Sequence, residues 1–218
     1  MCNRTDNLAG KTTLVSRIID HMRFQQPLLN GPVAFFYFKH REASKTSMVA
    51  MLRAIIVQLL YQDDTVLEFL HQKCASMSNT ELLRLPFLQD LTKGCLSMQR
   101  RVWIILDGLD EAEDQHGGNH EASTVIKWFQ KSIMLGSLFR ENQVRLLVAG
   151  QRDGHIDRLL SLCSEIRLER MNSHADDIEN YSRLRAASIR DRFSLELAEE
   201  RNIVKMVTDT SKGNPLPN

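Results

Sequence analysis

The residues with the clearest chemical potential stand near the start of the chain, where Gly10-Lys11-Thr12-Thr13 leads directly into a helical pattern. Backbone N–H groups at a helix N-terminus bind phosphate, a lysine ammonium neutralises the outer phosphates, and a hydroxyl ligates magnesium. Lys11 and Thr12 would take the last two roles. The four residues form the second half of a Walker A loop, whose full pattern has Gly where this chain has Thr5.

A second group of reactive side chains follows the apolar run 102–106, which continues into Asp107-Gly108-Leu109-Asp110-Glu111. Asp107, at the tip of the expected strand, is placed to hold magnesium directly or through water. Asp110 or Glu111 could orient an attacking water. The structural alternative is an acidic turn that caps the next helix. The two motifs together favour a nucleotide site over that alternative.

The elements that must position these residues are predicted from hydrophobic patterning. Continuous apolar runs at 33–38, 102–106 and 144–148 indicate strands of a parallel sheet buried on both faces, and 165–168 alternates like an edge strand. Apolar spacings of three and four predict helices, with Ser44–Ser47 offering cap hydroxyls and Pro86 marking a break. The predicted helices are 11–24, 48–60, 64–77, 88–98, 121–139, 175–192 and 195–207.

Strands separated by helical segments imply crossover connections, so we expect a three-layer α/β fold with a mostly parallel sheet. Ligands of such sheets lie at the carboxyl ends of the strands, which is where the acids at 107–111 are expected. Residues 1–170 are interpreted as this core. The charged helical sequence of residues 171–218 is interpreted as the start of a helical subdomain.

Composition narrows the classes of partner. The 218 residues are 43% hydrophobic and carry 28 Lys and Arg against 27 Asp and Glu, a net charge of +1. This balance gives no bulk attraction to nucleic acid or to an anionic membrane. The longest apolar runs fall far short of the ~20 residues that span a bilayer. With four isolated cysteines and no signal-peptide pattern, we expect a cytoplasmic protein.

At this point the sequence resembles a known family, the NACHT group of STAND nucleotide-binding switches, and within it the fungal, nephrocystin-like branch. The box Asp107-Gly108-Leu109-Asp110-Glu111, with a small residue directly after the first acid, is the most specific part of the likeness. The stretches that carry it are 10–14, 34–38 with 52–60, 106–111 and 144–152.

The resemblance implies binding of ATP or GTP with Mg²⁺, slow hydrolysis, and a switch that reports to effector and sensor repeat domains of a larger chain. It also implies homo-oligomerisation through the NACHT domain. By position, Lys11 and Thr12 look like the phosphate and magnesium residues and Asp107 like the Walker B acid. Asp110 and Glu111 look like the acids that orient water.

Two further positions are carried over from the family with alternatives. Arg152 resembles the sensor arginine after the fourth strand, but relatives usually end that strand in Ser-Arg, whereas this chain reads Ala149-Gly150-Gln151-Arg152. A solvated loop cation is the alternative. The segment 213–216 resembles a Gly-x-Pro element that touches the base, with a plain turn as the alternative.

Nine mostly polar residues precede Gly10, whereas a strand of about five apolar residues plus the loop would be expected there. We therefore expect the first strand to be missing or degraded, as in a fragment or a decayed copy, and nucleotide binding to be poor. A degenerate scaffold acting only through protein contacts is the main alternative function. A small-molecule kinase with the same loop is a weaker one, because no acceptor pocket is evident.

Overall fold

The computed structural model describes residues 11–25, 29–42, 44–112, 120–134, 143–151, 154–167 and 172–211. These fall into two compact units, one ending at Leu162 and the other starting at Cys163. Within the described ranges, no helix combines the length and the apolar character needed to cross a membrane.

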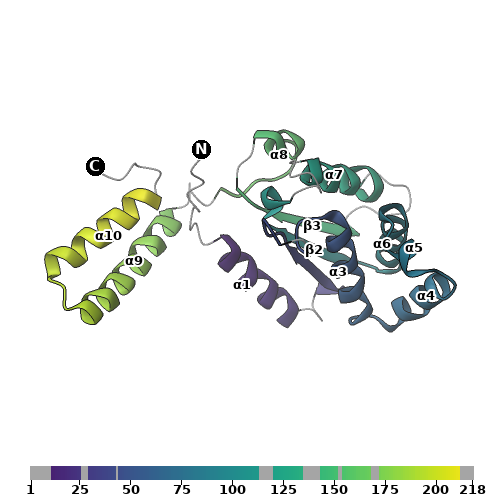
Figure 1. Cartoon of the computed structure of the whole chain (residues 1–218), viewed down its shortest axis with the longest axis horizontal. Coiled ribbons are helices and arrows are strands. Elements are labelled where there is room, and N and C mark those ends of the chain that lie inside the picture. The colour runs from purple at the N-terminus through teal and green to yellow at the C-terminus, as the bar shows by residue number, and fades with distance from the viewer. Residues whose placement is uncertain are drawn as a thin grey trace. The chain divides into compact units, whose positions relative to one another are not determined.

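The unit that ends at Leu162 is built on a parallel sheet of three strands, so the predicted α/β class is confirmed. The strands are β1 (Val33–Tyr37), β2 (Val102–Asp107) and β3 (Val144–Ala149), in the order β1-β2-β3. Tyr37 lies opposite Asp107, and Asp107 opposite Ala149. All three carboxyl ends therefore meet at one edge of the sheet (Figure 1).

The predicted helices are present: those over 11–24 and 48–60 have the predicted bounds, and the others have shifted ends. α6 begins ahead of Pro86 rather than after it, because proline fits the first turn of a helix, where no N–H partner is needed. The long helix expected over 121–139 is instead an α-helix followed by a π-helical turn, and residues 135–139 lie outside the described ranges. The helices of this unit are α1 (Lys11–Phe24), α3 (Met48–Leu60), α4 (Asp64–Cys74), α5 (Asn79–Leu82), α6 (Leu85–Met98), η1 (Leu109–Glu111), α7 (His120–Trp128), η2 (Phe129–Met134) and α8 (Gly154–Leu159).

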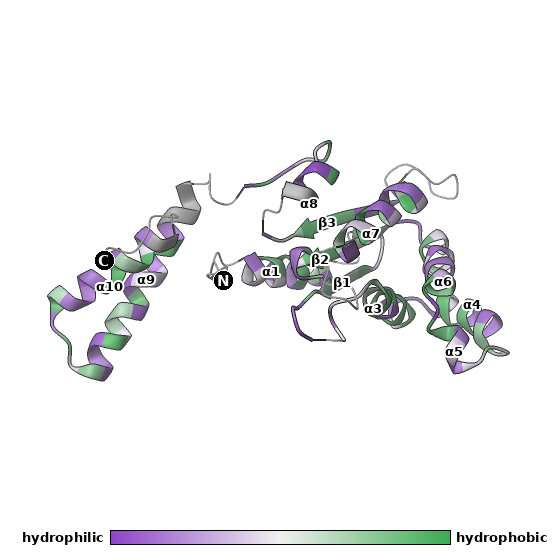
Figure 2. Cartoon of the chain, turned by 45° about the horizontal axis from the view of Figure 1, so that its top comes forward, coloured by the Kyte–Doolittle hydropathy of each residue, from purple (hydrophilic) through white to green (hydrophobic). Residues whose placement is uncertain are grey.

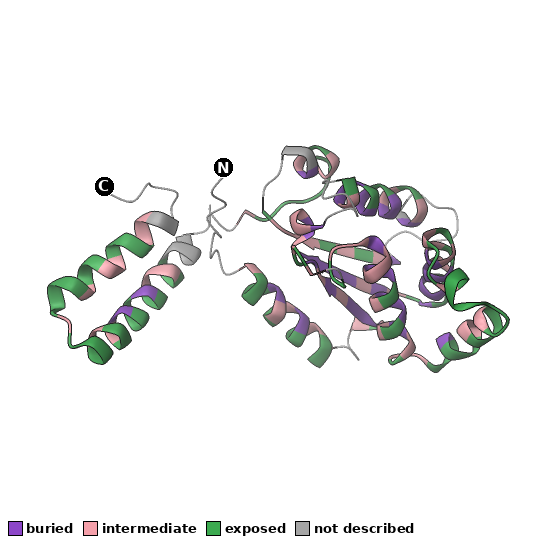
Figure 3. Cartoon of the chain, viewed as in Figure 1, coloured by how far each residue is buried: buried purple, intermediate pink, exposed green. Residues whose placement is uncertain are grey.

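Successive side chains of a strand point to opposite faces, and the two faces of this sheet are covered unequally. α1 packs Val15 and Ile19 against Val33 and Ile105 on one face. The helices α3, α6 and α7 bury the larger cluster, with Ala34 and its neighbours, on the other. Figure 2 shows the strands and α3 as predominantly hydrophobic, and Figure 3 shows buried residues concentrated in the same places.

The prediction that the strands are buried on both faces holds for most of β1 and β2, where only Phe35, Tyr37 and Trp103 are half-buried, and is wrong for β3. Arg145 and Leu147 of β3 are exposed, and both are on the face covered by α1. The cluster around α1 includes residues of β1 and β2 but, among the described residues of β3, only Ala149, which leaves the side chains of Arg145 and Leu147 uncovered. The Arg145 guanidinium instead stacks over the Trp103 ring, 5.1 Å from its centroid.

The strand predicted at 165–168 is also wrong over its described part, since residues 165–167 have no regular secondary structure. Ile166 is 77% exposed, so the alternating pattern has no core to face. Arg167 and Glu165 pair with each other at 2.7 Å.

The unit that starts at Cys163 contains a hairpin of two helices, α9 (Asn172–Phe193) and α10 (Leu197–Ser211). Ser182 and Ala186 are buried along α9, and the guanidinium of Arg190 reaches the carboxylate of Glu200 on α10 at 2.6 Å. Ser194 turns the chain between the helices with a positive φ of 51°.

Candidate nucleotide site at the carboxyl edge of the sheet

The acid box begins where β2 ends, and Gly108 shapes it. Gly108 has a φ of 69°, in the left-handed region that side chains disfavour. A Cβ at this position would also lie 2.8 Å from the carbonyl oxygen of Phe38. The Gly108 N–H donates to the carbonyl of Ala149 at 2.9 Å, which ties the turn to the end of β3. Only glycine satisfies both requirements, so Asp107 and the acids beyond it are fixed at this edge.

Asp107 is a buried carboxylate, only 4% exposed. Burial raises the pKa of Asp107, the Thr12 side chain and the Gly108 N–H counteract this by hydrogen bonding, and the charges of Asp110 and Glu111 raise it further. Within the described ranges, no Lys, Arg or His side chain forms an ion pair with Asp107. A buried carboxylate without a basic partner is an electrostatic setting suited to a metal cation.

The Thr12 side chain lies close enough to Asp107 to lower its pKa, and this proximity brings the two sequence motifs together. The first turn of α1, which contains Lys11, Thr12 and Thr13, therefore lies beside the tip of β2. Gly10, the remaining residue of the predicted phosphate loop, lies outside the described ranges. The helix N-terminus and the acid box are thus neighbours although many residues separate them in the sequence.

The donor set at this point fits magnesium. A hydroxyl and a carboxylate supply the hard oxygen ligands that Mg²⁺ prefers. In the described ranges, no group of three or more His, Cys, Asp or Glu side chains is placed so that it could hold a metal ion by itself. An ion held by Thr12 and Asp107 would complete its shell with phosphate oxygens and water, which is how Mg²⁺ binds together with nucleotides.

Asp110 joins the acid box to the loop after β3. Its Oδ1 accepts a hydrogen bond from the backbone N–H of Gln151 at 2.9 Å. A Cβ on Gly150 would lie 2.5 Å from the same oxygen, so this position has no room for a side chain. Arg152, the predicted sensor arginine, lies outside the described ranges, as does the segment 213–216.

Glu111 joins the acid box to the loop on the other side, after β1. Its Oε2 accepts a hydrogen bond from the backbone N–H of His40 at 3.0 Å. Sequence reasoning missed this contact and that of Asp110, although the glycine directly after β3 signalled a close approach of backbone to another group. Each of the two acids therefore has one oxygen bound to a neighbouring loop.

A shallow depression of about 620 Å³ lies elsewhere, beside the amino-terminal end of β1. Asp63, its acidic residue, already accepts hydrogen bonds from Thr65 and Gln99. These bonds stabilise the start of α4, so the acidic residue of the depression has a structural role.

Comparison with known proteins identifies a family for this chain. No curated protein and no solved structure matches the chain. The family model described as "Nephrocystin 3, N-terminal" matches residues 5–151, which cover the sheet, α1 and the acid box. The chain therefore belongs to the nephrocystin 3 N-terminal family.

Proposed function

We propose that this chain is a nucleotide-binding switch domain of the P-loop, NACHT type, which binds ATP or GTP with Mg²⁺ at the carboxyl edge of its sheet. The observation that carries the proposal is the approach of the Thr12 side chain to the buried carboxylate of Asp107, whose pKa it lowers. This approach sets the Lys-Thr start of α1 beside an acid at a strand tip, which is the pairing that nucleotide chemistry needs.

Each residue has a distinct part in this proposal. The N–H groups at the start of α1 and the ammonium of Lys11 attract phosphate oxygens. Thr12 and Asp107 provide oxygen ligands for Mg²⁺, which would neutralise charge on the phosphates. Thr5, in place of the first glycine of the motif, weakens the phosphate loop, so we expect an affinity weaker than micromolar.

Hydrolysis would be slow, because the candidate acids are partly engaged. One oxygen of Asp110 is bound to Gln151, and one oxygen of Glu111 is bound to His40. Each carboxylate therefore has fewer acceptor sites left with which to orient a water molecule. A slow NTPase suits a switch, which must stay in its triphosphate state long enough to act on effector and sensor domains of a larger chain.

The same two hydrogen bonds favour a second candidate function, a scaffold that acts only through protein contacts. In a scaffold, Asp110 and Glu111 would serve to fasten the loops after β3 and β1. The burial of Asp107 supports the nucleotide switch over the scaffold, because a buried carboxylate without an ion-pair partner among the described residues costs stability and gives nothing to a scaffold.

Isothermal titration of ATP and of GTP, each with magnesium, tests the proposal. Lys11→Ala and Asp107→Ala are expected to abolish the binding shown by the wild type. Lys127→Ala removes an equivalent charge from an exposed position on α7 and should leave binding unchanged. Absence of binding in the wild type at millimolar nucleotide would favour the scaffold.

A further inference from the structure

The loop between β1 and α3 is fastened to the candidate nucleotide site. The Phe38 N–H donates to the carbonyl of Asp107 at 2.8 Å, and the His40 N–H donates to the carboxylate of Glu111 at 3.0 Å. The residues that follow His40 are therefore held at the carboxyl edge of the sheet, beside the acid box.

This loop is also closed on itself around Glu42. The Lys39 N–H donates to the carbonyl of Lys45 at 3.0 Å, and the Lys45 N–H donates to the carbonyl of Glu42 at 2.7 Å. The carboxylate of Glu42 pairs with the ammonium groups of Lys39 and Lys45, and these two partners lower the pKa of Glu42 to about 2. The charges of Lys39 and Lys45 are thus neutralised locally.

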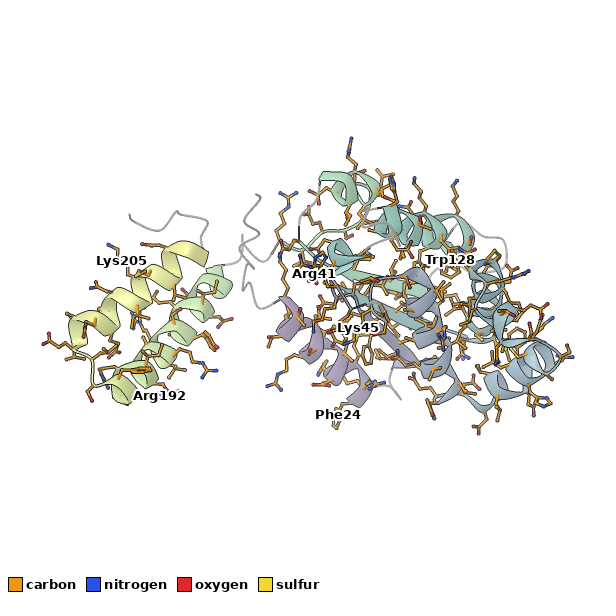
Figure 4. All side chains as sticks on the ribbon, in the orientation of Figure 1. Phe24, Arg41, Lys45, Trp128, Arg192 and Lys205 are labelled. Atoms are coloured by element: carbon orange, nitrogen blue, oxygen red, sulfur yellow. The ribbon has the colours of Figure 1, made fainter. Side chains whose placement is uncertain are left out.

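Arg41 is the exception in this loop. It has a φ of 61°, a left-handed conformation that costs free energy for any residue other than glycine. Its side chain is exposed and, within the described ranges, forms no ion pair with an acid. Figure 4 shows Arg41 on the side of the α/β unit where α1 begins. A strained backbone thus presents a guanidinium that no described acid neutralises, one residue after the N–H that binds Glu111.

We propose that Arg41 contacts the outermost phosphate of the bound nucleotide and makes the site prefer triphosphate over diphosphate. The inference rests on the proposed function. A planar guanidinium matches phosphate oxygens with two parallel hydrogen bonds, which a lysine cannot reproduce. The outermost phosphate is the partner because the N–H groups at the start of α1 take the inner phosphates, while Arg41 comes from the loop bound to Glu111, an acid that could orient the water attacking the outermost phosphate.

Titrations of the full chain with ATP and with ADP, both with magnesium and repeated with GTP and GDP, test the inference. Arg41→Ala is expected to weaken triphosphate binding about tenfold or more and to leave diphosphate binding unchanged. Arg41→Lys should recover only part of the loss. Arg41→Gly should lose the preference while raising thermal stability, because glycine accepts the positive φ. Arg53→Ala, an exposed arginine on α3, is the control and should change neither affinity.

The outcomes separate the two proposals. Equal effects of Arg41→Ala on triphosphate and diphosphate, or no effect on either, would overturn the role of Arg41 and leave the nucleotide site intact. A wild-type chain that binds neither nucleotide overturns the proposed function, and the role of Arg41 with it.

Discussion

At the scale of single residues, the site depends on carboxylates that have two functions at once. Asp110 is both an acid of the candidate site and the anchor of the loop after β3, through its bond to the Gln151 N–H. Gly150 allows this contact because it has no Cβ. Its φ is not positive, so its backbone conformation does not require glycine. The glycine is therefore needed for space and not for conformation.

We expect Gly150→Ala to lower the free energy of unfolding by about 2 kcal/mol, because the added methyl group displaces the carboxylate and breaks its hydrogen bond. The same substitution in an Asp110→Ala background should cost much less, since the carboxylate that it meets is gone. Urea unfolding of the four proteins of this cycle measures the coupling. Equal costs in both backgrounds would show that Asp110 does not set the requirement for glycine.

Asp107 provides a second prediction at this scale, because burial and the nearby acids disfavour its charge. In the absence of nucleotide and magnesium, Asp107→Asn is expected to raise the free energy of unfolding at neutral pH. Asparagine keeps an oxygen that can accept from Thr12 or Gly108 and removes the buried charge. Asp90→Asn, at an exposed position on α6, should change little. A less stable Asp107→Asn protein would mean that the hydrogen bonds of the carboxylate outweigh its burial.

At the scale of secondary-structure elements, the two outer strands of the sheet, β1 and β3, differ in whether the backbone groups on their outer sides have hydrogen-bond partners. Gln58 of α3 and Gln62, just after the end of α3, take the place of a neighbouring strand along β1. The Gln58 side chain accepts from the Phe35 N–H at 3.1 Å and donates to the Phe35 carbonyl at 2.7 Å. Gln62 makes the same pair of bonds to Val33, each 3.0 Å long. The amides thus satisfy backbone groups that would otherwise be open to another strand.

Gln58→Ala should therefore lower the free energy of unfolding by about 1–3 kcal/mol, because it leaves the N–H and carbonyl of Phe35 without partners. The exposed edge should also increase aggregation during refolding. Gln72→Ala makes the same chemical change at an exposed position on α4 and is the control. Urea unfolding and light scattering measure the two effects. A Gln58→Ala protein as stable and as soluble as the control would show that the glutamine bonds contribute nothing.

The outer edge of β3 has no equivalent cover. The N–H of Gly108 bonds to the carbonyl of Ala149, so the alternation of a parallel ladder turns the N–H and carbonyl groups of Val144, Leu146 and Val148 away from β2. Within the described ranges, these groups form no hydrogen bond. Among the residues that the structure describes, β3 is thus the open outer strand of the sheet, and β1 is the closed one.

These elements show what the sequence can and cannot predict. The strand at 102–106 can be predicted because a continuous apolar run indicates local burial. The acids that come directly after this run are then expected at the tip of the strand. The place of the acids near Lys11 follows from the general rule that ligands lie at the carboxyl ends of parallel strands. The bond from Gln58 to Phe35 and that from Asp110 to Gln151 depend on how α3 and β3 are set against the other elements. Such tertiary placement leaves no periodic signal in one sequence.

At the scale of the whole molecule, the α/β unit contains its own core. The members of both hydrophobic clusters lie between Val15 and Leu160, and none comes from the helical hairpin. The last helix of the unit, α8, belongs to this core. Ile156 is buried in the larger cluster, and Gln130 donates to the carbonyl of Leu159 at 2.8 Å.

We therefore expect a chain that ends at Leu162 to keep a cooperative thermal transition close to that of the full chain. Ending the chain at Gln151 instead removes α8, exposes the surface that Ile156 covers and leaves Gln130 without its partner. This shorter chain should unfold at a temperature lower by at least about 5 °C, since the loss of one buried aliphatic side chain with its contacts costs several kcal/mol. Circular dichroism during heating compares the three proteins. Because the two deletions differ only by residues 152–162, a low melting temperature in both would show that the α/β unit depends on the hairpin, whereas a low value in the shorter chain alone places the boundary of the core at α8.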